Sequence, residues 1–351
     1  MATTTAENVD IVSKHPVRLG QAVERVFMYI LLVGVAAWLL ANFIHGPSQV
    51  IQSLVYGIQL GALYALIALG YSLVYGIIEL INFAHGDLFM LGTLMSAAVV
   101  TTWFGQTSVG GAGWAAFGAA LIIVPAFCAG VNMLIEFLAY RRLRHAPKLA
   151  PLITAVGMSF VLQYIGLQWN GSIQLSRPTV LPKGHFEVLG ISVQNSFIVV
   201  LAVTIPVLVG LTLLVTRTRL GKAMRAVAQD PDASRLMGIN VNWIISLTFG
   251  LGGALAGVAG LVYEQSIGTT RYDLGLQLGL IAFTAAVLGG IGSLPGAVVG
   301  AMLIGIIQAL NEGVHWGAGQ RWTQSVVFVI LILVMVFRPN GLMGASTKEK
   351  V

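Results

Sequence analysis

Long apolar stretches separated by short polar segments run through the whole chain. About 20 apolar residues are needed to cross a bilayer as a helix. On this measure the pattern predicts about ten spans, near residues 27–44, 49–75, 86–104, 114–139, 150–170, 195–216, 243–265, 277–291, 295–312 and 322–337. Residues 289–296 fit either a turn outside the membrane or a break within it. The predicted fold class is therefore all-α, a polytopic integral membrane protein.

Composition supports this interpretation. The 351 residues are 57% apolar and 9% charged, whereas soluble domains carry about 25% charged residues. The formal net charge of +6 is spread in short clusters between apolar segments. Nucleic-acid binding is not indicated, because it requires a basic face. The single cysteine, Cys128, excludes an intrachain disulfide and is expected to be a buried structural thiol.

The distribution of Lys and Arg predicts the orientation of the chain. With the N-terminus in the cytoplasm, fifteen of the 19 basic residues fall on the inner side, and the outer side has only Arg177, Lys183, Arg271 and Arg321. Positive loops remain preferentially in the cytoplasm. Both termini are therefore predicted to be cytoplasmic. The apolar run 27–44 is longer than the apolar core of a signal peptide, so we expect it to be a retained first span.

Two features of the connecting segments predict local structure. The outer loop 171–195 contains Pro, Gly and short apolar segments, and it fits either a small hairpin or a simple connector. Glycines at small-xxx-small spacing predict helices whose backbones pack closely in lipid. These pairs are Gly57 and Gly61, Gly253 and Gly257, and Gly296 and Gly300.

The inner loop 217–242 is the longest connection on the predicted cytoplasmic side. Asp230 followed by Pro231 is typical of a helix start, and Gly238 is typical of a helix end. The short helix predicted at 231–237 presents Leu236 and Met237 beside Arg235. Two interpretations remain open, a solvated linker and a helix that docks in a groove on a cytoplasmic partner.

The sequence contains no recognisable motif for ATP binding or for catalysis. It has no G-x-x-x-x-G-K-[ST] phosphate-binding loop, so ATP would be bound by another subunit. The histidines at 85, 145, 185 and 315 lack the spacing of a metal site, and no nucleophile lies in a recognisable elbow. No catalytic residue and no metal ligand is therefore predicted.

Four polar residues lie in an otherwise apolar segment: Glu79, Asn82, His85 and Asp87. Polar groups at membrane depth are costly and need partners. In one interpretation they cap two helix ends and bond to one another at an interior break, with Asp87 capping the following helix. In a second, some of them face a translocation path. In a third, Glu79, His85 and Asp87 form a proton relay.

Three segments resemble the permeases of the branched-chain amino acid ABC transporter family, of the LivH type. They are LYALIALGYSLVYGIIELINFAHG at 63–86 with Asp87 after it, GKAMRAVAQDPDASRLMGIN at 221–240, and AFTAAVLGGIGSLPGAVVG at 282–300. The resemblance runs from about Ile51 to Gly344. It implies a permease domain at 46–344, preceded at 1–45 by a tail and an additional first helix and followed by a cytoplasmic tail at 345–351.

The resemblance implies a subunit of an importer in the bacterial inner membrane. Its expected partners are two ATP-binding subunits that hold ATP and Mg, a second related permease of the LivM type, and a periplasmic substrate-binding protein. The cargo would be leucine, isoleucine or valine, although relatives carry urea or short amides. The loop then corresponds to a coupling helix, with Arg225, Asp230, Pro231, Arg235, Leu236, Met237 and Gly238 as its coupling residues. The alternative is a proton-coupled secondary transporter or a channel.

Overall fold

The computed structural model describes residues 29, 33–144, 146–147, 149–182, 184–188 and 191–344. An apolar helix at Val33–His45 comes first. The first half of the chain then forms α2 (Pro47–Ile78), α3 (His85–Ala97), η1 (Ala98–Trp103), α4 (Gly111–Ile135), η2 (Glu136–Tyr140), α5 (Arg141–Leu143) and α6 (Leu149–Asn170). The second half forms α7 (Asn195–Arg217), α8 (Arg219–Gln229), α9 (Pro231–Leu236), α10 (Val241–Ile267), α11 (Leu274–Gly289), α12 (Leu294–Gly313), η3 (Gln320–Trp322) and α13 (Thr323–Phe337).

The all-α membrane fold predicted from the sequence is confirmed. Among the described residues, eight helices are long and apolar enough to cross a bilayer, and two shorter apolar helices lie at Val33–His45 and Leu274–Gly289. A total of ten spans stays a prediction. The tails at 1–25 and 345–351 lie outside the described residues. So do residues 27, 28 and 30–32 of the predicted first span.

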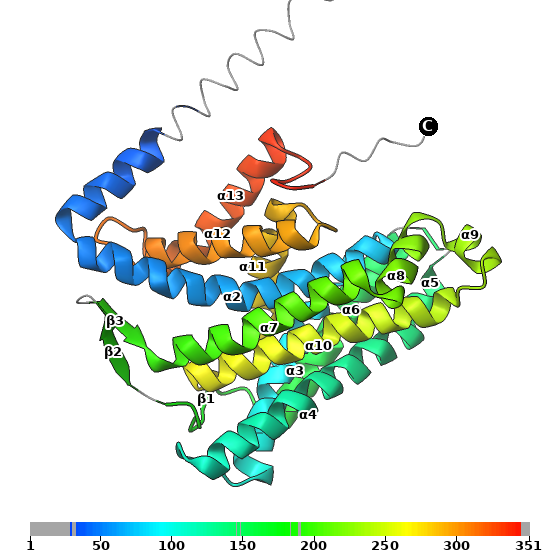
Figure 1. The fold of residues 1–351 in the computed structure, drawn as a ribbon, viewed down its shortest axis with the longest axis horizontal. Coiled ribbons are helices and arrows are strands. Elements are labelled where there is room, and N and C mark those ends of the chain that lie inside the picture. Colours follow the sequence, from blue (N-terminus) through cyan, green and yellow to red (C-terminus); the bar gives the residue numbers. More distant parts are fainter. Residues whose placement is uncertain are drawn as a thin grey trace, which may run out of the picture.

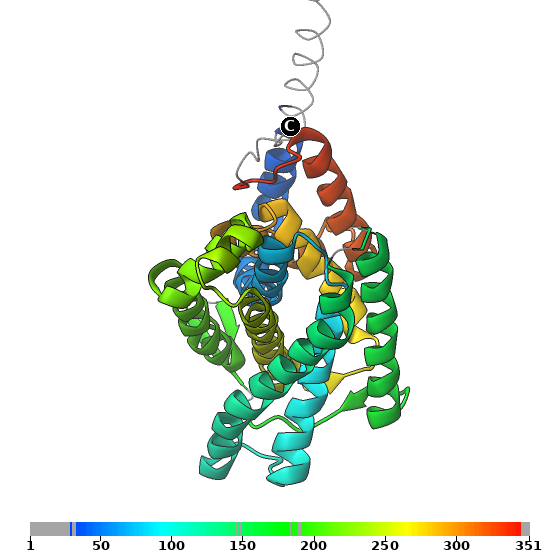
Figure 2. The same cartoon turned by 90° about the vertical axis from the view of Figure 1, so that its right-hand side faces the viewer.

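Helices α2 and α10 form the centre of the bundle (Figures 1 and 2). In each of them 83% of the most apolar stretch is buried inside the chain, against 22% for α7 and 11% for η3–α13. Helix α2 packs mainly on α12, and α10 packs on α4 and α3. Neither central helix has a polar face along its whole length. A helix of this kind is expected to be buried on all sides.

The small-xxx-small glycines lie where these helices meet. Gly57 and Gly61 face α12, Gly253 and Gly257 face α4, and Gly296 and Gly300 face α11. A methyl group at Gly57 would lie 2.7 Å from Ile306 Cα, and one at Gly257 would lie 2.9 Å from Pro125 Cα. These separations are shorter than van der Waals contact, so the paired backbones can reach these positions only because glycine lacks a side chain.

The two ends of the bundle differ. At one end, the hairpin end, strands β2 (His185–Val188) and β3 (Ile191–Gln194) pair antiparallel beside the start of α2 (Figure 1). The short pair β1 (Leu175–Ser176) and β4 (Thr269–Thr270) joins the loops there. The loop 171–195 therefore contains a hairpin, one of the two structures considered for it. At the opposite end, α8 and α9 project beyond the helices. We call it the basic end, because α5 with Arg141 and Arg142 and α8 with Arg219, Lys222 and Arg225 lie there.

The segment 289–296 forms a turn between α11 and α12. Gly290 and Gly292 both have positive φ, of 107° and 86°, a conformation that glycine adopts more easily than other residues. Ser293 caps α12, because its hydroxyl accepts a bond from the Gly296 amide at 3.2 Å. The chain after α13 returns to this turn, since the Leu342 and Met343 amides donate to the Leu288 and Gly289 carbonyls, each at 2.9 Å. The last described residues thus close the end of α11.

Candidate coupling site and intramembrane polar residues

Helix α9 begins at Asp230, as the sequence predicts. The Asp230 carboxylate accepts bonds from the Asp232 and Ala233 amides, both at 2.9 Å, and Pro231 occupies the first helical position. This arrangement satisfies amides that have no partner within the helix. The preceding helix α8 is capped in the same way by Thr218, which accepts from the Gly221 amide at 3.1 Å. Two side-chain caps therefore define the loop as a helix pair.

The tip of α9 exposes two large apolar side chains. Leu236 is 90% exposed and Met237 is 82% exposed. Gly238 ends the helix at φ 81°, and the Ile239 amide donates to the Ser234 carbonyl at 3.0 Å. An apolar side chain that a local turn holds in water has no packing function inside the chain.

The charged residues of this loop hold it together. Arg235 lies beside Asp232 at 2.8 Å on α9, in an exposed pair. Arg225 donates to the backbone carbonyl of Val215 and so joins α8 to the end of α7. Among the predicted coupling residues, Arg225 thus bonds to the end of α7, whereas Leu236 and Met237 are exposed at the tip of α9.

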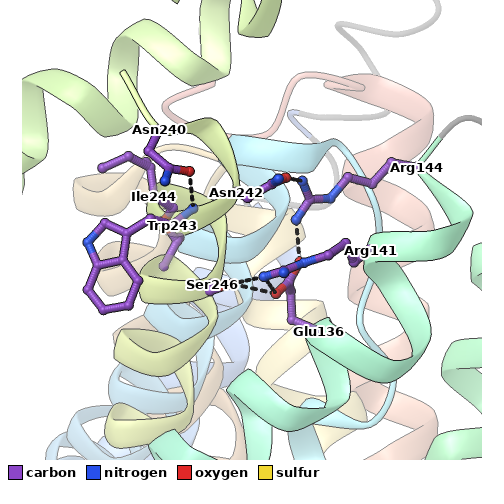
Figure 3. Close-up of polar contacts among 9 residues, drawn as sticks. Glu136, Arg141, Arg144, Asn240, Asn242, Trp243, Ile244 and Ser246 are labelled. Carbon is purple, nitrogen blue, oxygen red and sulfur yellow. Dashed lines mark hydrogen bonds and ion pairs between the residues drawn. The ribbon is translucent and has the colours of Figure 1, made fainter. Parts of the chain in front are cut away.

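A buried ion cluster, which was not predicted from the sequence, joins the end of α4 to the first turns of α10 (Figure 3). Glu136 is fully buried where α4 passes into the π-helical turn η2. Its Oε2 accepts from Arg141 at 3.1 Å and from the Ser246 hydroxyl at 2.5 Å, and its Oε1 accepts from Arg144. Arg144 also donates to Asn242 Oδ1 at 2.6 Å. We call these five residues the Glu136 cluster.

The Glu136 cluster connects α4 to the start of α10. Asn242 and Ser246 lie in the first turns of α10, which begins a few residues after α9 ends and is capped by Asn240 through the Trp243 amide at 3.1 Å. Burial lowers the pKa of the Arg144 guanidinium, and the neighbouring Glu136 carboxylate opposes this shift. The ion pairs lie within the α4–η2–α5 segment, and hydrogen bonds from Ser246 to Glu136 and from Arg144 to Asn242 join this segment to the start of α10.

One sequence signal identifies this cluster in retrospect. Glu136 is an acidic residue within an apolar helix, and Arg141 and Arg144 follow it within nine residues. A π-helical turn often marks a functional position in a helix, but no sequence pattern shows that Ser246 and Asn242 would complete the cluster from a distant helix.

The polar run after α2 lies at the break between α2 and α3. Glu79 ends α2 in the left-handed conformation, with φ 52°, and its amide donates to the Tyr75 carbonyl at 2.8 Å. Asn82 is buried, and its Oδ1 accepts from the Ala84 amide at 3.1 Å and from the Tyr140 hydroxyl at 3.0 Å. Asn82 therefore supports the break and joins it to η2.

His85 and Asp87 are both fully buried in the first turn of α3. The His85 ring lies edge-on against Tyr71, with 4.7 Å between centroids. Asp87 Oδ2 accepts from the Ser159 hydroxyl at 2.5 Å, and Gln163 donates to that same hydroxyl at 3.1 Å. The Asp87 carboxylate is thus held by α6.

The structure corrects two details of the predicted polar run. Asp87 does not cap α3, because the helix begins earlier, after Ala84, once Asn82 has turned the chain. Nor do the side chains of Glu79, Asn82, His85 and Asp87 bond to one another, although the His85 amide donates to the Asn82 carbonyl at 3.1 Å. The side chains of the last three contact different neighbours, namely α4 and η2, Tyr71, and α6. Within the described residues, no group of three or more His, Cys, Asp or Glu side chains is arranged to hold a metal ion.

Comparison with known proteins gives the context for this arrangement. The family model described as "Branched-chain amino acid transport system / permease component" matches residues 53–336. The chain is 43% identical over 307 residues to the high-affinity branched-chain amino acid transport system permease protein BraD of Pseudomonas aeruginosa, covering 86% of this chain and 98% of that protein. It is 38% identical over 310 residues to LivH of Escherichia coli strain K12, covering 86% and 97%.

A more distant relative matches most of the chain as well. The probable branched-chain amino acid transport permease protein LivH of Methanocaldococcus jannaschii is 28% identical over 306 residues, covering 82% of this chain and 90% of that protein. The matched region includes the break after α2, the α8–α9 loop and the α11–α12 turn. The chain therefore belongs to the family of branched-chain amino acid transport system permease components.

Proposed function

We propose that this chain is the permease subunit of a binding-protein-dependent ABC importer that moves branched-chain amino acids into the cell. Membership of the permease family and the names of the related BraD and LivH proteins support this proposal. The expected assembly contains two ATP-binding subunits with ATP and Mg, a second related permease and a periplasmic binding protein. The chain would reside in the bacterial inner membrane.

The observation that carries the proposal is the exposed tip of α9. Leu236 and Met237 lie in water at the end of a helix that is capped at both ends. A capped helix with an apolar tip has the form required to insert into a groove on another protein. We therefore assign α9 as the helix that docks on an ATP-binding subunit, and we assign the Glu136 cluster as the connection that carries its movement into the bundle.

The orientation follows from the same assignment. Docking on an ATP-binding subunit requires the basic end to face the cytoplasm, and the positive loops independently favour that placement. Both termini are then cytoplasmic, and the hairpin end faces the periplasm. The two arguments use different observations, because one concerns exposed apolar side chains and the other the distribution of charge.

Substitution of Leu236 tests the docking assignment. Burial of a leucine side chain contributes about 1.5–3 kcal/mol, and an aspartate in the same groove would also lose hydration. We expect Leu236→Asp to weaken binding of the ATP-binding subunits at least about tenfold and to abolish uptake, with normal insertion of the chain in the membrane. Met343→Asp is the matched control, since Met343 is a half-exposed apolar residue in the C-terminal turn. Normal uptake by Leu236→Asp would refute the docking assignment.

The alternative of a proton-coupled transporter predicts a different energy source. Under the proposal, uptake stops when the ATP-binding subunits or the binding protein are deleted and continues after the proton gradient is collapsed at constant ATP. Asp87→Asn is expected to leave this resistance to proton-gradient collapse unchanged. Uptake that ceases with the proton gradient and survives loss of the ATP-binding subunits would favour the alternative.

A further inference from the structure

A cavity of about 430 Å³ opens at the hairpin end, away from the break after α2 and from α9. The first half of α2, the end of α12, the start of α7 and the β2–β3 hairpin line it, and these elements lie together on the left of Figure 1. Its volume is in the range of sites for small molecules, about 300–1,000 Å³.

A polar stripe on α2 forms one wall of this cavity. Gln49, Gln52, Tyr56 and Gln59 are separated by three, four and three residues, which places them on one face of the helix. The stripe becomes more buried along the helix, from the exposed Gln49 and Gln52 to Gln59, which is 6% exposed. Within the described chain the Gln59 amide has no hydrogen-bond partner. Gln59 lines the cavity, so its amide is available to a ligand there.

Among the described residues of the cavity lining, Glu312 on α12 is the only carboxylate, and none of them is Lys or Arg. Its Oε1 accepts from Gln308 at 3.1 Å and from the Thr323 hydroxyl at 2.8 Å. Tyr64 in turn donates to Gln308 Oε1 at 2.8 Å and so orients that amide. The carboxylate is therefore fixed in position by one oxygen, while within the described residues its Oε2 has no partner.

The β2–β3 hairpin also contributes an amide donor to the lining. Gln194 at the end of β3 accepts from the Ser196 hydroxyl at 3.2 Å, which leaves its NH₂ group for another acceptor. Val55, Phe197 and Ala309 contribute apolar surface to the same lining. The cavity thus combines one fixed negative charge, several neutral amide donors and an apolar wall.

We propose that this cavity binds the transported amino acid at the hairpin end of the permease. Glu312 accepts the α-ammonium group, the glutamine amides donate to the α-carboxylate, and the apolar wall contacts the aliphatic side chain. The inference rests on the proposed function, and it places a substrate site away from Glu79, Asn82, His85 and Asp87.

The test uses the complete transporter in lipid nanodiscs, without the binding protein, and a radiolabelled leucine analogue whose side chain carries a photoreactive diazirine. We expect labelling of the α2 segment that contains Tyr56 and Gln59. Excess L-leucine should abolish the labelling, whereas 4-methylpentanoate, which has the same carbon skeleton without the ammonium group, should not.

Two variants separate binding from folding. Glu312→Gln removes the charge and should lower labelling about tenfold, the effect of losing about 1.4 kcal/mol. Gln59→Met keeps the side-chain length and leaves the Glu312 contacts intact, and it should also lower labelling. Glu187→Gln is the matched control, because Glu187 is an exposed carboxylate on the same hairpin and does not line the cavity. It should label like the wild type.

Failure of the inference can be told apart from failure of the proposed function. If the wild-type transporter with its binding protein takes up leucine but labelling falls outside this cavity, the substrate site proposed here is overturned and the importer function stands. Equal competition by 4-methylpentanoate, or unchanged labelling of both Glu312→Gln and Gln59→Met, overturns it as well. Absence of ATP-driven uptake of any aliphatic amino acid overturns the proposed function itself.

Discussion

Replacement of Glu136 by glutamine tests the link between α9 and the rest of the bundle. The substitution keeps the volume of the side chain and removes the charge that faces Arg141 and Arg144. The glutamine oxygen can still accept one bond, but its NH₂ group meets a guanidinium donor in place of an acceptor. Two positive charges then lie close together, with Ser246 and Asn242 as their remaining partners.

The expected cost follows from the burial of the three ionic groups. The Glu136 side chain is 0% exposed, Arg144 is 16% exposed and Arg141 is 32% exposed. Removal of one partner from a buried pair costs about 3–5 kcal/mol. Because water screens Arg141 in part, we take the lower end of this range, about 3 kcal/mol. At about 2 °C per kcal/mol for a large domain, the apparent Tm should fall by about 6 °C.

The assay compares the thermal unfolding of purified variants in one detergent and then their coupling in proteoliposomes. Glu136→Gln should lower Tm and should also reduce uptake per ATP hydrolysed, while the ATP-binding subunits still bind. Ser246→Ala removes one hydroxyl from the cluster and should cost about 1 kcal/mol. An exposed carboxylate is the control, and Glu187→Gln should unfold like the wild type. Wild-type Tm and coupling in Glu136→Gln would refute both the cost and the proposed link.

Three further predictions concern helix ends and helix packing. Asp230→Ala removes the cap of α9 and should cost about 1 kcal/mol, lowering uptake partially, whereas Asp232→Ala loses only an exposed ion pair and should transport normally. Gly257→Leu should prevent folding, because its Cβ would lie 2.9 Å from Pro125 Cα. Size-exclusion chromatography should then show aggregation. In the control Gly118→Leu the added Cβ has nothing within 4 Å, and this variant should remain monodisperse. Gly238→Val places a β-branched residue at φ 81° and should cost about 1–3 kcal/mol locally, so uptake should fall while membrane insertion is retained.

The polar run after α2 shows why the burial of polar side chains was easier to predict than the partners that they contact. The cost of polar groups in lipid predicts that Glu79, Asn82, His85 and Asp87 are enclosed; the last three are buried, whereas Glu79 is exposed at the end of α2. Two of the partners, Ser159 of Asp87 and Tyr140 of Asn82, are more than 50 residues away along the chain. Partner choice depends on which helices become neighbours, which local sequence does not specify.

The sequence by itself determined the features that arise within one segment. Apolar runs of spanning length specified the helices, because backbone groups in lipid must bond within their own segment. Asp230, Pro231 and Gly238 specified α9, because capping acts over three or four residues. Small residues at fixed spacing identified the surfaces at which helices approach closely.

Only the tertiary structure decided which distant segments meet. The Glu136 cluster requires α4 and α10 to be adjacent, and the hairpin-end cavity requires α2, α7, α12 and the β2–β3 hairpin to converge. In both places each segment contributes one or two polar side chains, which are uninformative in isolation. Their chemistry arises from convergence, because a charge acquires a function through the groups that surround it in a medium of low dielectric constant.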